Sequence, residues 1–126
     1  MMESHEDCLI YLEKIRWNGL PTCPYCGSTK ASVYKNEHRY RCNSCFTSYS
    51  VTVRTLFHQT HVDLRKWFHA IALLHSLKGN ISVRKLAQEI GVSRAAATSI
   101  VEKIYFAADD DVKILKEIER DRDFRI

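Results

Sequence analysis

The chain has 126 residues, of which 45% are hydrophobic and 27% charged, with five cysteines, four glycines and two prolines. This length and composition fit a small globular protein and exclude a disordered segment, a collagen-like repeat and a large multidomain enzyme. The longest nearly apolar run, Trp67 to Leu77, is interrupted by polar residues, so no segment is predicted to span a bilayer. The N-terminus lacks the cationic start and following apolar stretch of a secretory signal. We therefore expect a cytoplasmic protein.

The formal net charge of +4 is unevenly distributed along the chain. Residues 1–22 hold 2 basic and 4 acidic side chains, net −2, and residues 108–126 hold 5 and 7, also net −2. Residues 23–107 hold 12 basic and 4 acidic side chains, net +8. A basic middle suits a polyanionic partner, because contacts to phosphates release counterions.

Residues 1–20 are predicted to form an N-terminal helix. Cys8 lies in this amphipathic segment, away from the other cysteines, and is expected to be a small buried apolar residue.

The other four cysteines form two Cys-x-x-Cys pairs, Cys23/Cys26 and Cys42/Cys45, separated by fifteen residues. This spacing is typical of a four-thiolate zinc site, because each short turn directs two sulfurs at one ion. Two disulfides are the main alternative, but the unpaired fifth cysteine and the missing signal peptide count against them. A redox Cys-x-x-Cys is disfavoured by the absence of a βαβ pattern. We predict one structural Zn²⁺ without an open coordination position.

The segment around the cysteines is predicted to be a three-stranded ribbon over residues 21–57. Residues 31–35 and 38–41 form a hairpin about Asn36-Glu37, and residues 46–53 form the third strand by their alternating pattern. Gly27 permits the backbone to fold back under the metal. His58 and His61 lie in the linker that follows, and four thiolates leave them little role as ligands.

From Leu64 the hydrophobic period changes from two to about 3.6 residues, which predicts three helices over residues 62–107. The first ends near Lys78-Gly79-Asn80, Ser82 caps the second, and Ser93 caps a third that runs to about Ala107. A small residue at Ala87 and a turn at Gly91 are typical of a helix-turn-helix. A plain three-helix core is the alternative, but the zinc ribbon and the basic charge favour DNA binding.

If the third helix enters a major groove, the outer side chains near its start should contact bases. The predicted DNA contacts on this helix are Ser93, Arg94, Ala95, Thr98 and Ser99. Arg94 could bond a guanine edge or a phosphate, while Ala95 and the Thr98 methyl group could touch thymine methyl groups. Further cations that would contact phosphates are Arg84 and Lys85 on the second helix, and Lys35, Arg39 and Arg41 on the ribbon.

Residues 108–126 are predicted to form an acidic amphipathic tail helix, with Val112, Leu115 and Ile118 on one side. Adjacent carboxylates fan out around a helix, so the Asp109–Asp111 run indicates charge at a helix N-terminus rather than a two-metal site. The apolar side could dock a partner or support a homodimer.

Several blocks of sequence together resemble a known family. They are Tyr11-Leu12, Arg16-Trp17-Asn18-Gly19, Cys23-Pro24-x-Cys26-Gly27, Tyr40-Arg41-Cys42-x-x-Cys45, Ser50-Val51-Thr52, Thr55-x-Phe57, Leu64-Arg65-Lys66-Trp67-Phe68-x-Ala70-Ile71 and Leu86-Ala87-x-Glu89-Ile90-Gly91-Val92. From about Glu6 to Lys103, the chain resembles the zinc-ribbon N-terminal part of bacterial and archaeal insertion-sequence transposases related to the Merlin superfamily. It departs from that pattern at Arg54, where a small residue is expected, and at Thr98, where the family usually has an aromatic residue.

The resemblance implies that the ribbon and the helix-turn-helix bind the terminal inverted repeats of a mobile element. It also implies a following ribonuclease-H-like nuclease domain, which residues 108–126 are not expected to supply. We therefore predict an α+β protein with an N-terminal helix, a three-stranded zinc ribbon, a three-helix helix-turn-helix domain and a C-terminal helix.

The predicted function is zinc-dependent binding of double-stranded DNA without catalysis, as a stand-alone DNA binder or regulator, with no small-molecule substrate and with association to the nucleoid when bound. Two alternatives remain open: a targeting fragment whose nuclease domain is missing or separate, and a zinc-ribbon protein-interaction module.

Overall fold

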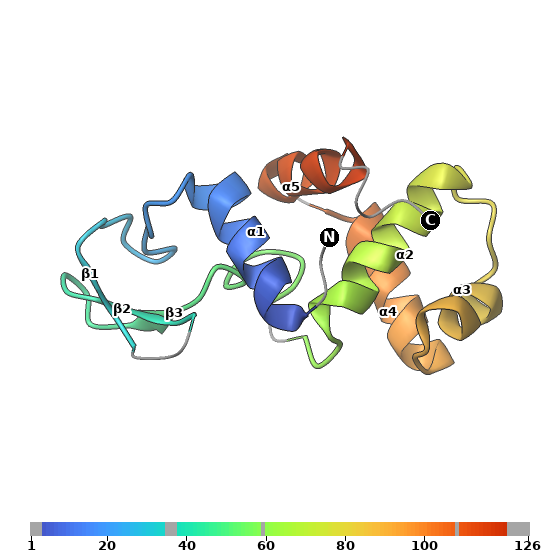
Figure 1. Ribbon diagram of the computed structural model, residues 1–126, viewed down its shortest axis with the longest axis horizontal. Helices are drawn as coiled ribbons and strands as arrows, with labels where there is room; N and C mark the ends of the chain where they lie inside the picture. Colours follow the sequence, from blue (N-terminus) through green and yellow to red (C-terminus); the bar gives the residue numbers. More distant parts are fainter. Residues whose placement is uncertain (1–3, 35–37, 59, 108, 121–126) are drawn as a thin grey trace.

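The computed structural model describes residues 4–34, 38–58, 60–107 and 109–120. Within these ranges the elements are α1 (His5–Trp17), β1 (Ala31–Val33), β2 (Tyr40–Cys42), β3 (Ser48–Tyr49), α2 (Leu64–Ser76), α3 (Val83–Ile90), α4 (Arg94–Tyr105) and α5 (Asp109–Arg120). Figure 1 shows the small sheet at one end of the long axis and α3 with α4 at the other, with α1, α5 and α2 between them. The predicted α+β architecture is confirmed.

Helix α1 begins and ends where its caps and charges favour it. The Ser4 hydroxyl accepts a hydrogen bond from Asp7 N at 3.1 Å, and Asn18 ends the helix in the left-handed conformation, with φ 52°. Acidic residues occupy the first turn and basic residues the last, as the helix dipole prefers. The helix buries Cys8, Leu12 and Trp17, so the prediction that Cys8 is buried is confirmed.

The three strands form one antiparallel sheet in the order β1-β2-β3. Tyr40 and Tyr49 are paired in register, and their rings stack with centroids 5.7 Å apart. The Trp17 ring meets both tyrosines edge-on, at 5.5 and 5.7 Å. One face of the sheet is therefore packed against the end of α1.

The third strand is shorter than the sequence predicts. It covers only Ser48–Tyr49, whereas residues 46–53 show the alternating pattern. Phe46, at φ 64°, closes the turn of the second cysteine pair, and Val53 N donates to Ser50 O in a turn after the strand. The Arg16 guanidinium donates to the carbonyl oxygens of Val51 and Val53, at 2.6 and 2.9 Å. This segment therefore bonds to α1 rather than extending the sheet.

The start signals predicted for the two helices after α2 are confirmed. Ser82 accepts a hydrogen bond from Lys85 N, and Ser93 accepts one from Ala96 N, both at 3.1 Å. Gly91 ends α3 at φ 73°, and its N–H donates to Ala87 O at 2.9 Å. The short link from Gly91 to Ser93 makes α3 and α4 packed neighbours, and both also contact α2.

Helix α5 is part of the core and does not extend away from it. Ile114, Leu115 and Ile118 are buried, and the helix packs on α1 and α2. Asp111 is also buried, and its carboxylate accepts a hydrogen bond from Leu56 N at 3.2 Å. The interpretation of this apolar side as a docking or dimerisation surface is corrected, because the chain's own core covers it. No helix within the described ranges is both long and apolar enough to cross a membrane.

Candidate metal centre and nucleic-acid interface

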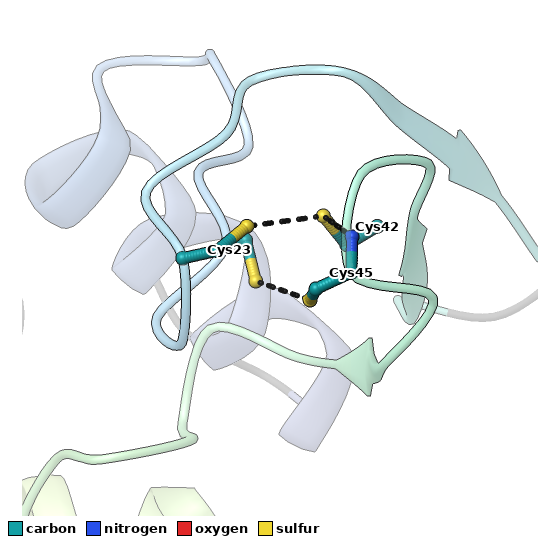
Figure 2. A group of neighbouring side chains, drawn as sticks. Cys23, Cys42 and Cys45 are labelled. Carbon is teal, nitrogen blue, oxygen red and sulfur yellow. Dashed lines mark hydrogen bonds between the residues drawn. The ribbon is translucent and has the colours of Figure 1, made fainter.

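Two backbone turns carry the four cysteines of the predicted zinc site. The turn between Cys23 and Gly27 is closed by a hydrogen bond from Gly27 N to Cys23 O, and the turn between Cys42 and Phe46 by one from Phe46 N to Cys42 O, both 2.9 Å long. In Figure 2 the loop with Cys23 faces the loop with Cys42 and Cys45. The fold therefore brings together two pairs that lie far apart in the sequence.

The sulfur geometry fits a tetrahedral zinc ion. All four Sγ atoms lie within 4.8 Å of one another. Cys23 Sγ lies 3.7 Å from Cys45 Sγ, and Cys26 Sγ lies 3.5 Å from Cys42 Sγ. A tetrahedron with Zn–S bonds of about 2.3 Å has edges of about 3.8 Å between sulfurs, and a disulfide needs about 2.0 Å. These distances match zinc coordination and exclude bonded pairs in this arrangement.

The local electrostatics favour thiolates on the second turn. The N–H groups of Cys45 and Ser44 both donate to Cys42 Sγ at 3.4 Å and lower the pKa of Cys42 to about 6. At Cys26, the backbone contact from Ser28 lowers the pKa, but the neighbouring sulfurs, Cys42 foremost, outweigh it and raise the pKa to about 12. Crowded thiols cannot all ionise without a cation, so the donor set is suited to a divalent ion that takes all four.

The linker histidine His58 has another role. Its Nδ1 accepts a hydrogen bond from Arg54 N at 2.8 Å. Within the described residues, the grouping of potential ligands that can hold a metal is the four cysteines. They form the site for one structural zinc ion, as predicted.

Comparison with known families identifies the N-terminal part of the chain. Residues 3–48 match the family model described as a transposase zinc-ribbon domain. This segment includes α1, all four cysteines and the first strands. The N-terminal part of the chain is therefore similar to a transposase zinc-ribbon domain.

A relative from a mobile element extends the likeness beyond the transposase zinc ribbon. The chain is 32% identical over 101 residues to an uncharacterized protein in transposable element ISH50 of Halobacterium salinarum. The match includes 78% of this chain but 34% of the relative, so the chain spans about a third of that protein's length. No solved structure matches the chain significantly. The expected resemblance to transposases is therefore confirmed.

The side chains predicted to contact DNA on α3 and α4 are all exposed to solvent. Arg84 and Lys85 are exposed in the first turn of α3, and Lys85 forms an ion pair with Glu89 at 3.1 Å. The exposed residues at the start of α4 are Ser93, Arg94, Ala95, Thr98 and Ser99. The sequence therefore predicted correctly which sides of α3 and α4 are free of the core.

The cations predicted on the zinc ribbon are placed separately from that surface. Arg41 is exposed on β2, and Arg39 is exposed directly before that strand. The sheet lies at the other end of the molecule from α3 in Figure 1. The Arg41 guanidinium lies over the Phe46 ring, 5.4 Å from its centroid. Lys35 lies outside the described residues.

Arg54 is a site residue whose role sequence reasoning did not assign. It adopts the left-handed conformation, with φ 61°, which explains why a small residue is expected at this position. Its guanidinium donates to Pro24 O at 3.0 Å and lies 4.8 Å from the Tyr25 ring centroid. Arg54 therefore connects the first cysteine turn to the segment after the sheet. Its departure from the family pattern was the available signal.

Proposed function

We propose that this chain is a DNA-recognition module of the kind used by transposases, in which zinc folds the ribbon and α4 reads a duplex. The charges at the helix starts carry the proposal. The first turns of α3 and α4 contain no acidic residue and instead hold exposed Arg84, Lys85 and Arg94. A helix N-terminus normally attracts anionic side chains, because its N–H groups carry partial positive charge. Two successive helices whose first turns add cations to this charge suit an external polyanion.

The spatial relation of α3 and α4 fits a helix-turn-helix. Gly91 is the left-handed turn residue, Ser93 caps the next helix, and the helices pack on each other and on α2. In such a unit the second helix lies in the major groove with its N-terminal residues at the base edges, while the first crosses the backbone. Arg94 is then the principal base or phosphate contact on α4, and Arg84 and Lys85 contact phosphates.

Thr98 supplies an apolar contact on this surface. Its hydroxyl donates to Arg94 O at 2.9 Å, which satisfies the polar group within the helix. The side chain is exposed, so its methyl group remains available to a thymine methyl group, as does the methyl group of Ala95.

The proposed partner is double-stranded DNA, and the terminal repeats of a mobile element are the proposed natural sites. We propose no catalysis by residues 1–126. The buried Asp111 bonds to the backbone of Leu56, so this member of the acidic run serves the fold. On this proposal the chain acts as a DNA binder or regulator, or as the targeting part of a larger transposition system. Its two functional domains are the zinc ribbon, residues 21–57, and the helix-turn-helix domain, residues 62–107. The interaction-module alternative loses support, since the apolar side of α5 is covered.

The test is fluorescence anisotropy of the zinc-loaded protein with duplexes selected from a random pool. We expect Lys85→Ala to weaken binding to all duplexes similarly and to reduce the salt slope by about 1. We expect Arg94→Ala to reduce discrimination between selected and scrambled duplexes. Equal discrimination by wild-type protein and Arg94→Ala would contradict the assignment of α4 as the reading helix.

A further inference from the structure

The outer face of the zinc-ribbon sheet brings exposed aromatic and cationic side chains together. Tyr34 N donates to Arg39 O at 3.0 Å, and Arg41 is paired in register with Ser48. Side chains alternate between the faces of a strand, so these residues lie opposite the buried Tyr40. A hydrogen bond of 2.8 Å between the Tyr34 and Ser48 hydroxyl groups confirms that both are on this outer face.

Phe46 is the most exposed aromatic residue of this region, with 67% of its surface accessible. Its ring lies beside the same face, because the Arg41 guanidinium is 5.4 Å from its centroid. Phe46 also adopts the left-handed backbone conformation, with φ 64°. The equivalent position in the first cysteine turn is a glycine, Gly27, with φ 78°. Neither core packing nor backbone geometry accounts for a large exposed ring at this place.

The charge of the region points to an anionic partner. Between residues 21 and 58 the sequence has five basic residues and a single acidic one, Glu37, which lies outside the described residues. Four thiolates with one zinc ion add a net charge of −2, so the region stays basic when the metal is bound. Arg39 and Arg41 are both exposed; the Arg41 guanidinium lies at the Phe46 ring, and Arg39 is the backbone hydrogen-bond partner of Tyr34.

We propose that this outer face binds an unpaired stretch of a DNA strand, with a base stacked on Phe46 and the adjacent phosphates at Arg39 and Arg41. Exposed aromatic rings beside cations are the general means of holding single-stranded nucleic acid, because every base has a face that can stack. In a duplex the base faces are covered by neighbouring pairs, so a protruding ring gains more from an unpaired base.

This surface is distinct from the helix surface that reads the duplex. The sheet lies at one end of the molecule and α3 with α4 at the other (Figure 1). The inference deepens the proposed function, since both assume DNA as partner, but each depends on different residues. A DNA end with a paired and an unpaired part could therefore contact both surfaces.

The test measures anisotropy of the zinc-loaded full chain with three labelled probes: a blunt selected duplex, the same duplex with a single-stranded extension, and a single strand of about 12 thymidines. We expect Phe46→Ala to weaken binding to the single strand by about tenfold or more and to leave binding to the blunt duplex unchanged. Phe46→Trp should retain binding, and bases stacked on the new indole should quench its fluorescence. Arg94→Ala is the matched control, which should weaken duplex binding without affecting the single strand.

Folding of each variant is monitored by zinc content and circular dichroism. Phe46→Gly should leave both measurements unchanged, because glycine suits the left-handed position. The inference is overturned if Phe46→Ala binds the single strand as wild-type protein does, or if it loses duplex binding equally. If wild-type protein binds the duplex with the expected dependence on Arg94 but shows no dependence on Phe46 for any probe, this inference alone fails. If wild-type protein binds none of the three probes, the proposed function fails with it.

Discussion

The Lys66 ammonium group donates a hydrogen bond of 2.8 Å to the carbonyl oxygen of Gly91. Lys66 belongs to α2, whereas Gly91 ends α3 and begins the turn into α4. A cation at the C-terminus of α3 is favoured by the helix dipole. This contact from α2 therefore fixes the turn that orients the proposed reading helix.

Replacing Lys66 by methionine should weaken both the fold and DNA binding slightly. The bond is exposed to solvent, so we expect a loss of about 0.5–1 kcal/mol in the free energy of unfolding. Lys66→Met should lose more duplex affinity than Lys113→Met does. Lys113→Met is the control, because it also removes one exposed lysine, from α5. Urea denaturation and duplex anisotropy measure the two effects, and equal behaviour of the two variants would contradict the role of the contact.

Removing zinc should make the four ligand cysteines reactive toward a thiol reagent, while Cys8 stays unreactive. The four clustered cysteines are protected as ligands, whereas Cys8 is fully buried in α1. Burial raises the pKa of Cys8 to about 12, with the nearby Asp63 charge adding to the effect, and the thiol form is unreactive. A thiol reagent should therefore count four cysteines after chelation and the fifth after denaturation. Elemental analysis should find one zinc per chain, and Cys42→Ser should lose it.

Substitutions at Thr98 should separate its methyl group from its hydroxyl group. Thr98→Val keeps the methyl group and should retain duplex affinity, whereas Thr98→Ser keeps the hydroxyl group and should lose affinity severalfold. Replacing the contacted thymine by uracil in the selected duplex should abolish the difference between wild-type protein and Thr98→Ser. If Thr98→Val is the weaker binder instead, the hydroxyl group reads the DNA and our interpretation of its bond to Arg94 is wrong.

Asp63 should contribute a pH-dependent part of the stability of α2. It caps the helix by accepting from Arg65 N at 2.8 Å. Burial raises its pKa, but the hydrogen bonds and charge of Arg65, helped by His5, outweigh this and leave the pKa lowered. A lowered folded-state pKa means stability that is present above the unfolded pKa and lost as pH falls through the folded pKa.

Two variants test this contribution. Asp63→Asn keeps a capping side chain without the charge, so its stability relative to the wild type should improve as pH falls below about 4. Asp63→Ala removes the cap and should cost about 1 kcal/mol at neutral pH. Because zinc ligands also protonate in acid, the comparison is made between variants at each pH. A difference between Asp63→Asn and wild type that does not change with pH would refute the assignment.

Helix α5 should be required for stability. Ile118 is fully buried against the core, so Ile118→Ala should lower the free energy of unfolding by about 2–4 kcal/mol. Lys116→Ala, on the exposed side of the same helix, should be nearly neutral. Equal stability of both variants would contradict the packing of α5 on the core.

The parts of this fold that the sequence predicts correctly are those with local causes. Ser82 and Ser93 cap their helices, and Gly91 makes its turn, because capping and left-handed conformations depend on a few adjacent residues. The zinc cluster is predictable because two thiolates on each short turn can satisfy a metal only by combining.

The features that escaped prediction arise from contacts between distant segments. The alternation over residues 46–53 suggested a longer strand, but Arg16 binds the carbonyl oxygens of Val51 and Val53 from α1. The sequence shows the apolar side of residues 108–126, whereas the packing of α5 on α1 and α2 depends on tertiary structure. Which side chains of α4 contact DNA stays a prediction, since exposure permits such contact without requiring it.

The most direct test of the central claim is the salt dependence of duplex binding by the zinc-loaded and the chelated protein. We predict that the zinc-loaded protein binds selected duplex, that the logarithm of its association constant falls linearly with the logarithm of salt concentration, and that Arg94→Ala loses discrimination. Chelation should unfold the zinc ribbon and weaken duplex binding by the chelated protein. A zinc-loaded, folded protein that binds no duplex at low salt would contradict the account.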